Sequence, residues 1–143
     1  MNIFHNPAEA FEKAAKAFLR NPSQQTYQKY INEFANAIFN KVEVQAMIIM
    51  ENIPEFGGPC MRLNRMTIGG KDYFSFYTNS RLIKSSPFDS DFANMTLDMV
   101  AELTIGDESI AGLIVNPSNG SDASISSETI RKCYEAAKAH KSN

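Results

Sequence analysis

The sequence predicts one α+β domain, in which a helical pair at the N-terminus packs on a mixed β-sheet and a further helix closes the C-terminus. Apolar residues recur at helical spacing over residues 7–38 and again over 127–140, and short runs between them alternate or stay apolar, as strands do. No internal repeat or low-complexity linker interrupts the 143 residues. We therefore expect a single domain over 1–143, with the helical pair in 1–40 and the sheet and remaining helices in 41–143.

Two amphipathic helices are predicted first. Asn6 suits the N-cap of the first helix, Pro7 its first turn and Glu9 the capping-box position. Asn21-Pro22 ends that helix, and Ser23 caps the second. Their apolar faces comprise Phe11, Ala14, Ala15, Phe18 and Leu19, and Tyr27, Tyr30, Ile31, Phe34, Ala35 and Ile38. Two such stripes cannot both be buried by the pair alone, so the helices must pack on a sheet.

Three strands are predicted next. Residues 42–50 begin as an alternation and end as a continuous apolar run, which indicates a strand whose second half is buried on both faces. Residues 51–59 form a loop. Strands over 60–68 and 72–78 are joined through Gly69-Gly70, a hairpin signal because tight hairpin turns need positive φ. The methionines, including Met47, Met50, Met61 and Met66, are interpreted as adaptable core residues.

The C-terminal third leaves one choice open. Residues 80–86 indicate a short helix or turn. Residues 90–103 fit one helix, and they also fit a short strand ending near Met95 followed by a helix from Leu97. A core strand then ends at Pro117, Asn119-Gly120 make a turn, and the last helix runs from about Ser127 to His140.

Composition limits which cellular compartment and which classes of partner are expected. The net charge is −2 and the pI about 5.7, with charges interspersed, so no nucleic-acid partner is expected. No apolar run approaches the ~20 residues of a membrane span, and no signal-peptide core is found at the N-terminus. We expect a cytoplasmic protein without membrane contact, in which Cys60 and Cys133 are reduced thiols.

No catalytic constellation is recognised. His5 and His140 lie near the ends of the chain, and nothing beside either one supplies a general-base partner. The loop after Asn116 has one glycine and no lysine, so it lacks the requirements of a phosphate-binding loop and favours a plain turn. We expect no catalytic residue, no metal and no cofactor.

Two surfaces are candidates for binding. Polar segments follow two strands, and parallel strands would bring them to one end of the sheet. The predicted contiguous surface consists of Thr78, Asn79, Ser80, Arg81, Asn116 and Ser118, with Arg81 meeting an anionic group or a partner carboxylate. The alternative is that Thr78 and Asn116 only cap the following turns. The second surface is a protein interface made by Arg62, Tyr73 and Tyr77, unless the N-terminal helices cover that face.

The order of these motifs resembles the N-terminal domain of the SseB (enhanced serine sensitivity) family. The resemblance rests on "FLRNPSQQTYQKYINEF", "VEVQAMIIM", "FSFYTNSRLIKSS" and "GLIVNP" before a terminal helix, and spans about residues 8–139. The chain departs from the family pattern at Tyr77, where Phe is common, and at Asn94 and Thr96, where the family continues apolar. The resemblance implies an α/β domain of bacteria, of poorly defined role, with no catalytic residues to carry over.

Two functional hypotheses follow. The first is a non-enzymatic interaction or regulatory module that binds a protein partner or itself, with a homodimer formed through an edge hairpin over residues 60–78. The alternative is a small-molecule binding protein or enzyme that uses the turns after Thr78 and Asn116.

Overall fold

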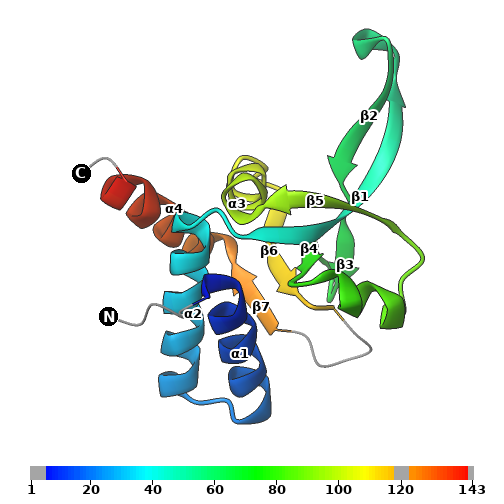
Figure 1. The fold of residues 1–143 in the computed structure, drawn as a ribbon. Coiled ribbons are helices and arrows are strands. Elements are labelled where there is room, and N and C mark those ends of the chain that lie inside the picture. The colour runs from blue at the N-terminus through cyan, green and yellow to red at the C-terminus, as the bar shows by residue number, and fades with distance from the viewer. Residues whose placement is uncertain (1–5, 118–122, 142–143) are drawn as a thin grey trace.

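Four α-helices and a seven-stranded mixed sheet make up the computed structural model, which describes residues 6–117 and 123–141 (Figure 1). The helices are α1 (Pro7–Arg20), α2 (Gln24–Phe39), α3 (Leu97–Ile105) and α4 (Ser127–Lys141). The strands are β1 (Glu43–Ile53), β2 (Gly58–Leu63), β3 (Met66–Ile68), β4 (Lys71–Tyr77), β5 (Asp91–Thr96), β6 (Ile110–Val115) and β7 (Ala123–Ser126). Two 3-10 helices, η1 (Pro54–Phe56) and η2 (Ser80–Ser85), complete the described elements. The predicted α+β class is confirmed.

The predicted caps of the N-terminal pair are confirmed. The Asn6 side chain accepts from the backbone N–H groups of Ala8 and Glu9 at 2.9 and 3.3 Å. Ser23 Oγ accepts from the Thr26 N–H at 3.0 Å, and Thr26 Oγ1 accepts from the Ser23 N–H at 2.9 Å. The two helices lie side by side (Figure 1).

The sheet has the order β2-β1-β4-β6-β7, with β3 paired to β4 and β5 paired to β1. Every pair is antiparallel except β4 and β6, which run parallel. The chain crosses from β4 to β6 through η2, β5 and α3. The carboxyl ends of β4 and β6 therefore lie next to each other.

All four helices contribute to one apolar core on a single face of the sheet. Phe11 of α1 lies at its centre, with its ring 5.7 Å from that of Tyr30, 5.6 Å from Phe34 and 6.2 Å from Phe76. The helical faces were predicted well, although Leu19 is 39% exposed. Met47, Ser75, Tyr77 and Ile114, on the other face of the sheet, are also buried but lie outside this core.

Strand β1 is longer than predicted, and its second half projects from the body together with β2 (Figure 1). We call residues 49–62, which comprise the outer part of β1, η1 and most of β2, the arm. The prediction that the second half of residues 42–50 is buried on both faces holds for Ala46, Met47 and Ile48. It is wrong for Ile49 and Met50, which are 46% and 52% exposed. The predicted loop over 51–59 is instead the outer half of a hairpin.

The strand predicted over 60–68 is divided at Asn64 and Arg65. Its first part pairs with β1, and its second part, β3, pairs with β4. Gly69 and Gly70 have φ values of 60° and 80°, so the predicted tight turn is confirmed. The 60–78 segment is not an edge hairpin as predicted, because β4 lies inside the sheet between β1 and β6.

In the C-terminal third, the strand-then-helix alternative is correct, with β5 ending at Thr96 and α3 beginning at Leu97. Strand β7 was not predicted. The expected turn at Asn119-Gly120, Ser118 and His5 lie outside the described residues, and of His140 only its place in α4 is described.

Candidate functional site

The two polar turns predicted to adjoin do meet in the structure. Phe76 of β4 is in register with Val115 of parallel β6, and the Asn116 N–H donates to the Phe76 carbonyl at 2.9 Å. Asn116 Oδ1 in turn accepts from the Thr78 N–H at 2.8 Å. The geometric part of the prediction is therefore confirmed for Thr78 and Asn116.

A residue that the sequence did not point to completes this cluster. The Thr78 hydroxyl donates to Glu12 Oε1 at 2.5 Å, and the Asn79 amide donates to the same oxygen. Glu12 lies on α1, 66 residues before Thr78, and its sequence context is that of an ordinary helical glutamate. Asn116 adopts a left-handed conformation with φ 54°, which asparagine tolerates better than most residues.

These contacts have a structural consequence: they tie α1 to the carboxyl ends of β4 and β6. Asn79 also caps η2 by accepting from the Leu82 N–H at 3.3 Å. The alternative that Thr78 and Asn116 only cap the following turns does not describe these contacts, because Asn79 caps η2 while Thr78 and Asn116 contact each other and Thr78 also contacts Glu12. Ser80 and Arg81 are exposed beside the cluster, and binding by Arg81 stays a prediction.

The proposed tyrosine and arginine surface is not formed as predicted. Tyr77 is only 3% exposed, and its hydroxyl donates to the Pro117 carbonyl at 2.6 Å and lies 2.8 Å from Ser86 Oγ. Tyr77 is therefore unavailable to a partner, and it contacts Ser86 after β4, Pro117 after β6 and the ring of Phe92 in β5. Tyr73 is half-buried, while the Arg62 side chain is 50% exposed and pairs with Glu51 at 2.6 Å.

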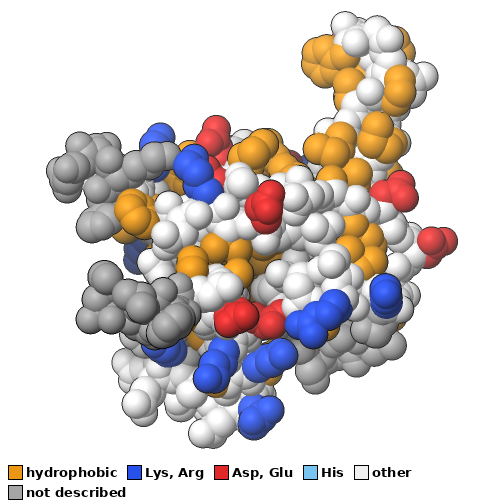
Figure 2. Space-filling view, viewed as in Figure 1, with side chains coloured by type: hydrophobic (Ala, Val, Ile, Leu, Met, Phe, Trp, Pro, Cys, Tyr) orange, Lys and Arg blue, Asp and Glu red, His pale blue; other side chains and the backbone are white. Residues whose placement is uncertain are grey.

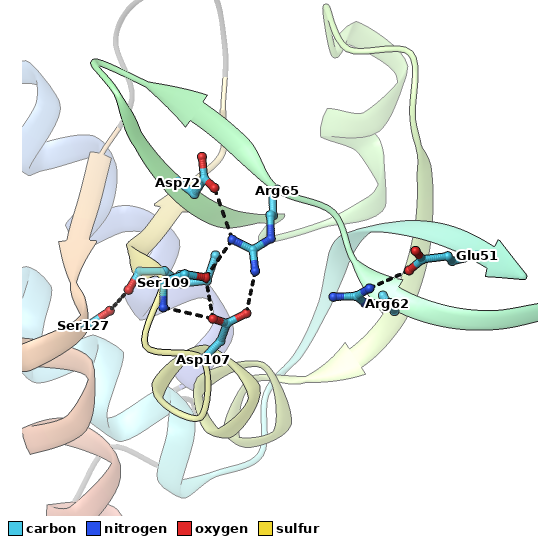
Figure 3. Close-up of polar contacts among 8 residues, drawn as sticks. Glu51, Arg62, Arg65, Asp72, Asp107, Ser109 and Ser127 are labelled. Carbon is cyan, nitrogen blue, oxygen red and sulfur yellow. Dashed lines mark hydrogen bonds and ion pairs between the residues drawn. The ribbon is translucent and has the colours of Figure 1, made fainter. Parts of the chain in front are cut away.

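At the other end of β4, Arg65 joins three segments of the chain (Figure 3). Its Nη1 donates to Asp72 Oδ2 at 3.1 Å and to Ser109 Oγ at 2.8 Å, and its Nη2 donates to Asp107 Oδ2 at 2.9 Å. The pKa of Asp72 lies below its usual value because Thr67 and Arg65 donate to its carboxylate. The pKa of Asp107 is lowered chiefly by hydrogen bonds from Ser109. This network links the β2–β3 turn to the amino ends of β4 and β6.

A cavity of about 310 Å³ lies between α2, α3 and α4. Lys41 Nζ lies 3.1 Å from Asp98 Oδ2, and Lys138 Nζ lies 5.4 Å from the centre of the Tyr134 ring. The Tyr134 hydroxyl donates to Glu102 at 2.7 Å. The lining of the cavity carries two lysines, Lys41 and Lys138, against one carboxylate, that of Asp98.

The arm is the most unusual surface of the described chain. Phe56 at its tip is 74% exposed, and Met61 on β2 is 49% exposed, beside Ile49 and Met50 on β1. Figure 2 shows hydrophobic side chains gathered along the projecting arm. We call Ile49, Met50, Phe56 and Met61 the arm patch. The interpretation of Met50 and Met61 as core residues is wrong, whereas Met47 is buried, on the face of the sheet opposite the main core.

The apolar surface continues at the base of the arm. A cavity of about 210 Å³ is lined there by Met61 and Leu63 of β2, Leu103 of α3, and further residues Arg62, Phe74, Met95 and Asp107. Leu103 is itself 49% exposed. The arm patch is thus joined to an exposed part of α3.

Among residues 6–117 and 123–141, no group of three or more His, Cys, Asp or Glu side chains is placed to hold a metal ion. None of the described helices combines the length and the apolar character needed to cross a membrane. Within the same part of the chain, Cys60 and Cys133 are free thiols, and burial raises the pKa of Cys133.

Comparisons with family models, curated proteins and solved structures found no match to this chain. The resemblance to the SseB family stays a prediction.

Proposed function

We propose that this protein is a non-enzymatic interaction module whose arm docks on a protein partner. The observation that carries the proposal is the exposure of four large apolar side chains on one projecting hairpin. Exposed apolar side chains gathered on one element are uncommon on soluble monomers and mark interaction sites. Met50 and Met61 share one face of the ribbon, and Ile49 lies on the other face. No packing requirement of the core accounts for this surface, because the core contains no residue from 50–61.

The architecture of the arm supports a protein as the partner. A two-stranded ribbon on its own is marginally stable in water, so a partner that packs against the arm would also stabilise it. Methionine side chains adapt to irregular partner surfaces, and Met50 and Met61 face the same side of the ribbon because they are directly paired. We expect this role in the bacterial cytoplasm, with another protein or a second copy of the chain as the partner.

The proposal is tested by capture of cross-linked partners on the full chain. Phe56→Ser combined with Met61→Ser removes two of the four apolar side chains of the arm patch, whereas Ile68→Ser removes an apolar side chain of β3, which is 44% exposed and lies off the arm. We expect the first variant to lose partners, or self-association measured by light scattering, and the second to keep them. Equal behaviour of both variants would contradict the proposal.

A small-molecule site at the adjoining turns is the second candidate, because Thr78 and Asn116 contact each other beside exposed Arg81. A thermal-shift screen of metals, nucleotides and amino acids tests it, since a ligand of the folded state raises the melting temperature. Stabilisation lost in Arg81→Ala, with the unliganded melting temperature unchanged, would support this candidate.

A further inference from the structure

The two edges of the arm differ in their hydrogen-bonding capacity. In an antiparallel ladder, backbone groups of alternate residues face opposite edges. In β1, the Met47 carbonyl accepts from the Asn64 N–H at 3.0 Å, so odd-numbered residues face the β2 and β4 side. The Val42 carbonyl accepts from the Leu97 N–H at 2.8 Å, so even-numbered residues face the β5 side.

Strand β5 covers its side of β1 only in part. Its first residue, Asp91, lies opposite Ile48, and the Ser90 hydroxyl bonds to the Ile48 carbonyl at 3.3 Å. Beyond Ile48, the backbone N–H and C=O groups of Met50 and Asn52 point away from β2, toward the side where β5 has ended. No described strand accepts or donates hydrogen bonds on that side of these two residues. This open edge continues the line of β5.

The outer edge of β2 is closed to the same kind of pairing. Pro59 lies opposite Asn52, so its nitrogen faces away from β1, and proline has no N–H to donate. Proline is one of the devices by which natural proteins protect sheet edges. The arm thus has one blunted edge, on β2, and one open edge, on β1.

We propose that the partner adds an extended antiparallel strand to β1 along Met50–Asn52, in line with β5. This inference rests on the proposed function and specifies how the arm binds. Strand addition would use the backbone groups of Met50 and Asn52, and the apolar side chains of the arm patch would pack against the added strand. The result is a three-stranded arm, which is more stable than the ribbon.

Glu51 sets the chemistry of the partner strand. Its backbone groups face β2, so its partner across the open edge occupies a non-hydrogen-bonded position, where side chains approach most closely. Opposite charges are favoured at such positions. Ile49 and Ile53 flank Glu51 on the same face of β1. The partner strand therefore carries Lys or Arg opposite Glu51, with apolar residues two positions before and after it.

The same residue argues against a second copy as the occupant. In a dimer, the β1 edges of two copies would pair in antiparallel fashion. Both copies would use the outward backbone groups of Met50 and Asn52 only if Met50 of one copy lay opposite Asn52 of the other. That register places Glu51 opposite Glu51, and like charges facing each other are destabilising. A basic strand from another protein fits this edge better.

The test uses the full chain and two short fluorescent peptides. Each peptide alternates Thr and Val around a central residue, which is Lys in one and Glu in the other. By fluorescence polarisation we expect about a threefold preference for the Lys peptide, as one cross-strand charge pair provides. By NMR, the Met50 and Asn52 amide signals should shift most. Failure of both peptides to bind would overturn the proposal.

Two variants make the test specific. Asn52→Pro removes an N–H that faces outward and costs no bond between β1 and β2, so it should keep the fold and weaken peptide binding by about fivefold or more. Glu51→Lys combined with Arg62→Glu inverts the charges while keeping the pair now seen at 2.6 Å, and it should invert the peptide preference. Unchanged binding in the first variant or unchanged preference in the second would refute strand addition.

These outcomes are separable from those of the proposed function. If Phe56→Ser with Met61→Ser abolishes capture of a partner while Asn52→Pro leaves it intact, the arm is the interface and strand addition is wrong. If neither affects capture, both proposals fail.

Discussion

Arg65 illustrates how single polar residues organise this protein. It reaches Asp72, Asp107 and Ser109, which belong to different segments of the chain (Figure 3). Each carboxylate also accepts from a hydroxyl of a neighbouring residue, Thr67 or Ser109. The network holds the amino ends of β4 and β6 together.

This network predicts a pH-dependent effect of losing Arg65. The folded-state pKa values of Asp72 and Asp107 lie below their ordinary value of 3.8, so the ionised carboxylates stabilise the fold above that pH. The contribution is lost as the pH falls through the lowered values. Arg65→Gln should therefore reduce the melting temperature most near pH 7, and the difference from the native chain should narrow below about pH 4.

Thermal melts of both proteins between about pH 2 and pH 7 measure this difference. Lys71→Gln is the control, because Lys71 is an exposed cation next to Asp72 that makes no described ion pair with it. A gap that stays constant across the pH range would show that Arg65 stabilises the protein by packing instead.

Sequence reasoning at the residue scale found three of the four residues of the polar cluster at the carboxyl ends, namely Thr78, Asn79 and Asn116. Thr78 and Asn116 were found because each directly follows a recognisable strand. Glu12 was not found, because its role depends on where α1 docks, and nothing in the local pattern of an amphipathic helix reports that position.

At the scale of elements, Gly112 shows how closely β6 and β7 approach. A Cβ atom at Gly112 would lie 2.1 Å from the backbone oxygen of Ile125 and 3.1 Å from the Cα of Ser126. These are backbone atoms of β7, so a side chain at Gly112 cannot be accommodated by a rotamer change. The glycine is required by the spacing of the two strands.

We therefore expect Gly112→Ala to destabilise the protein by about 3 kcal/mol, at the upper end of the cost of overpacking a core. Chemical denaturation followed by circular dichroism gives this value. Ala111→Ser, at the neighbouring half-buried position of the same strand, should change stability far less. Similar losses in both variants would mean that β6 is sensitive to any substitution.

The elements that sequence analysis missed have a common physical cause. The apolar run ending at Met50 has the same sequence pattern whether its side chains pack in the core or lie exposed on the arm, so the exposure of the arm could not be inferred. Strand β7 is only four residues long and contains serines at alternate positions, which is too short a pattern to distinguish from a helix N-terminus. The helices and the Gly69-Gly70 turn were predictable because caps and positive φ leave local signals.

At the scale of the whole molecule, the arm and the body should be separable. Ile49 and Arg62 form a directly paired position of the ladder, so an Asn-Gly turn joining them closes a regular two-residue hairpin. Replacing residues 50–61 by Asn-Gly should change the melting temperature by less than about 4 °C, because these residues contribute nothing to the core.

Calorimetry measures that change, and partner capture provides the functional readout. The shortened chain should keep its fold and lose its partners. A large fall in melting temperature would show instead that the arm supports the sheet from which it projects.

The packing of α4 against α2 has a consequence for folding during translation. The Cys133 thiol lies 4.0 Å from the Ile31 carbonyl of α2, and α4 packs along that helix, although the two are about a hundred residues apart in the chain. The side of α2 that packs on α4 therefore lacks this native partner until a segment about a hundred residues later in the chain has been translated. Contacts of such long sequence separation slow folding and leave apolar surface open to wrong associations. For this protein, the side of α2 that packs on α4 is the part that a chaperone acting during translation would need to cover.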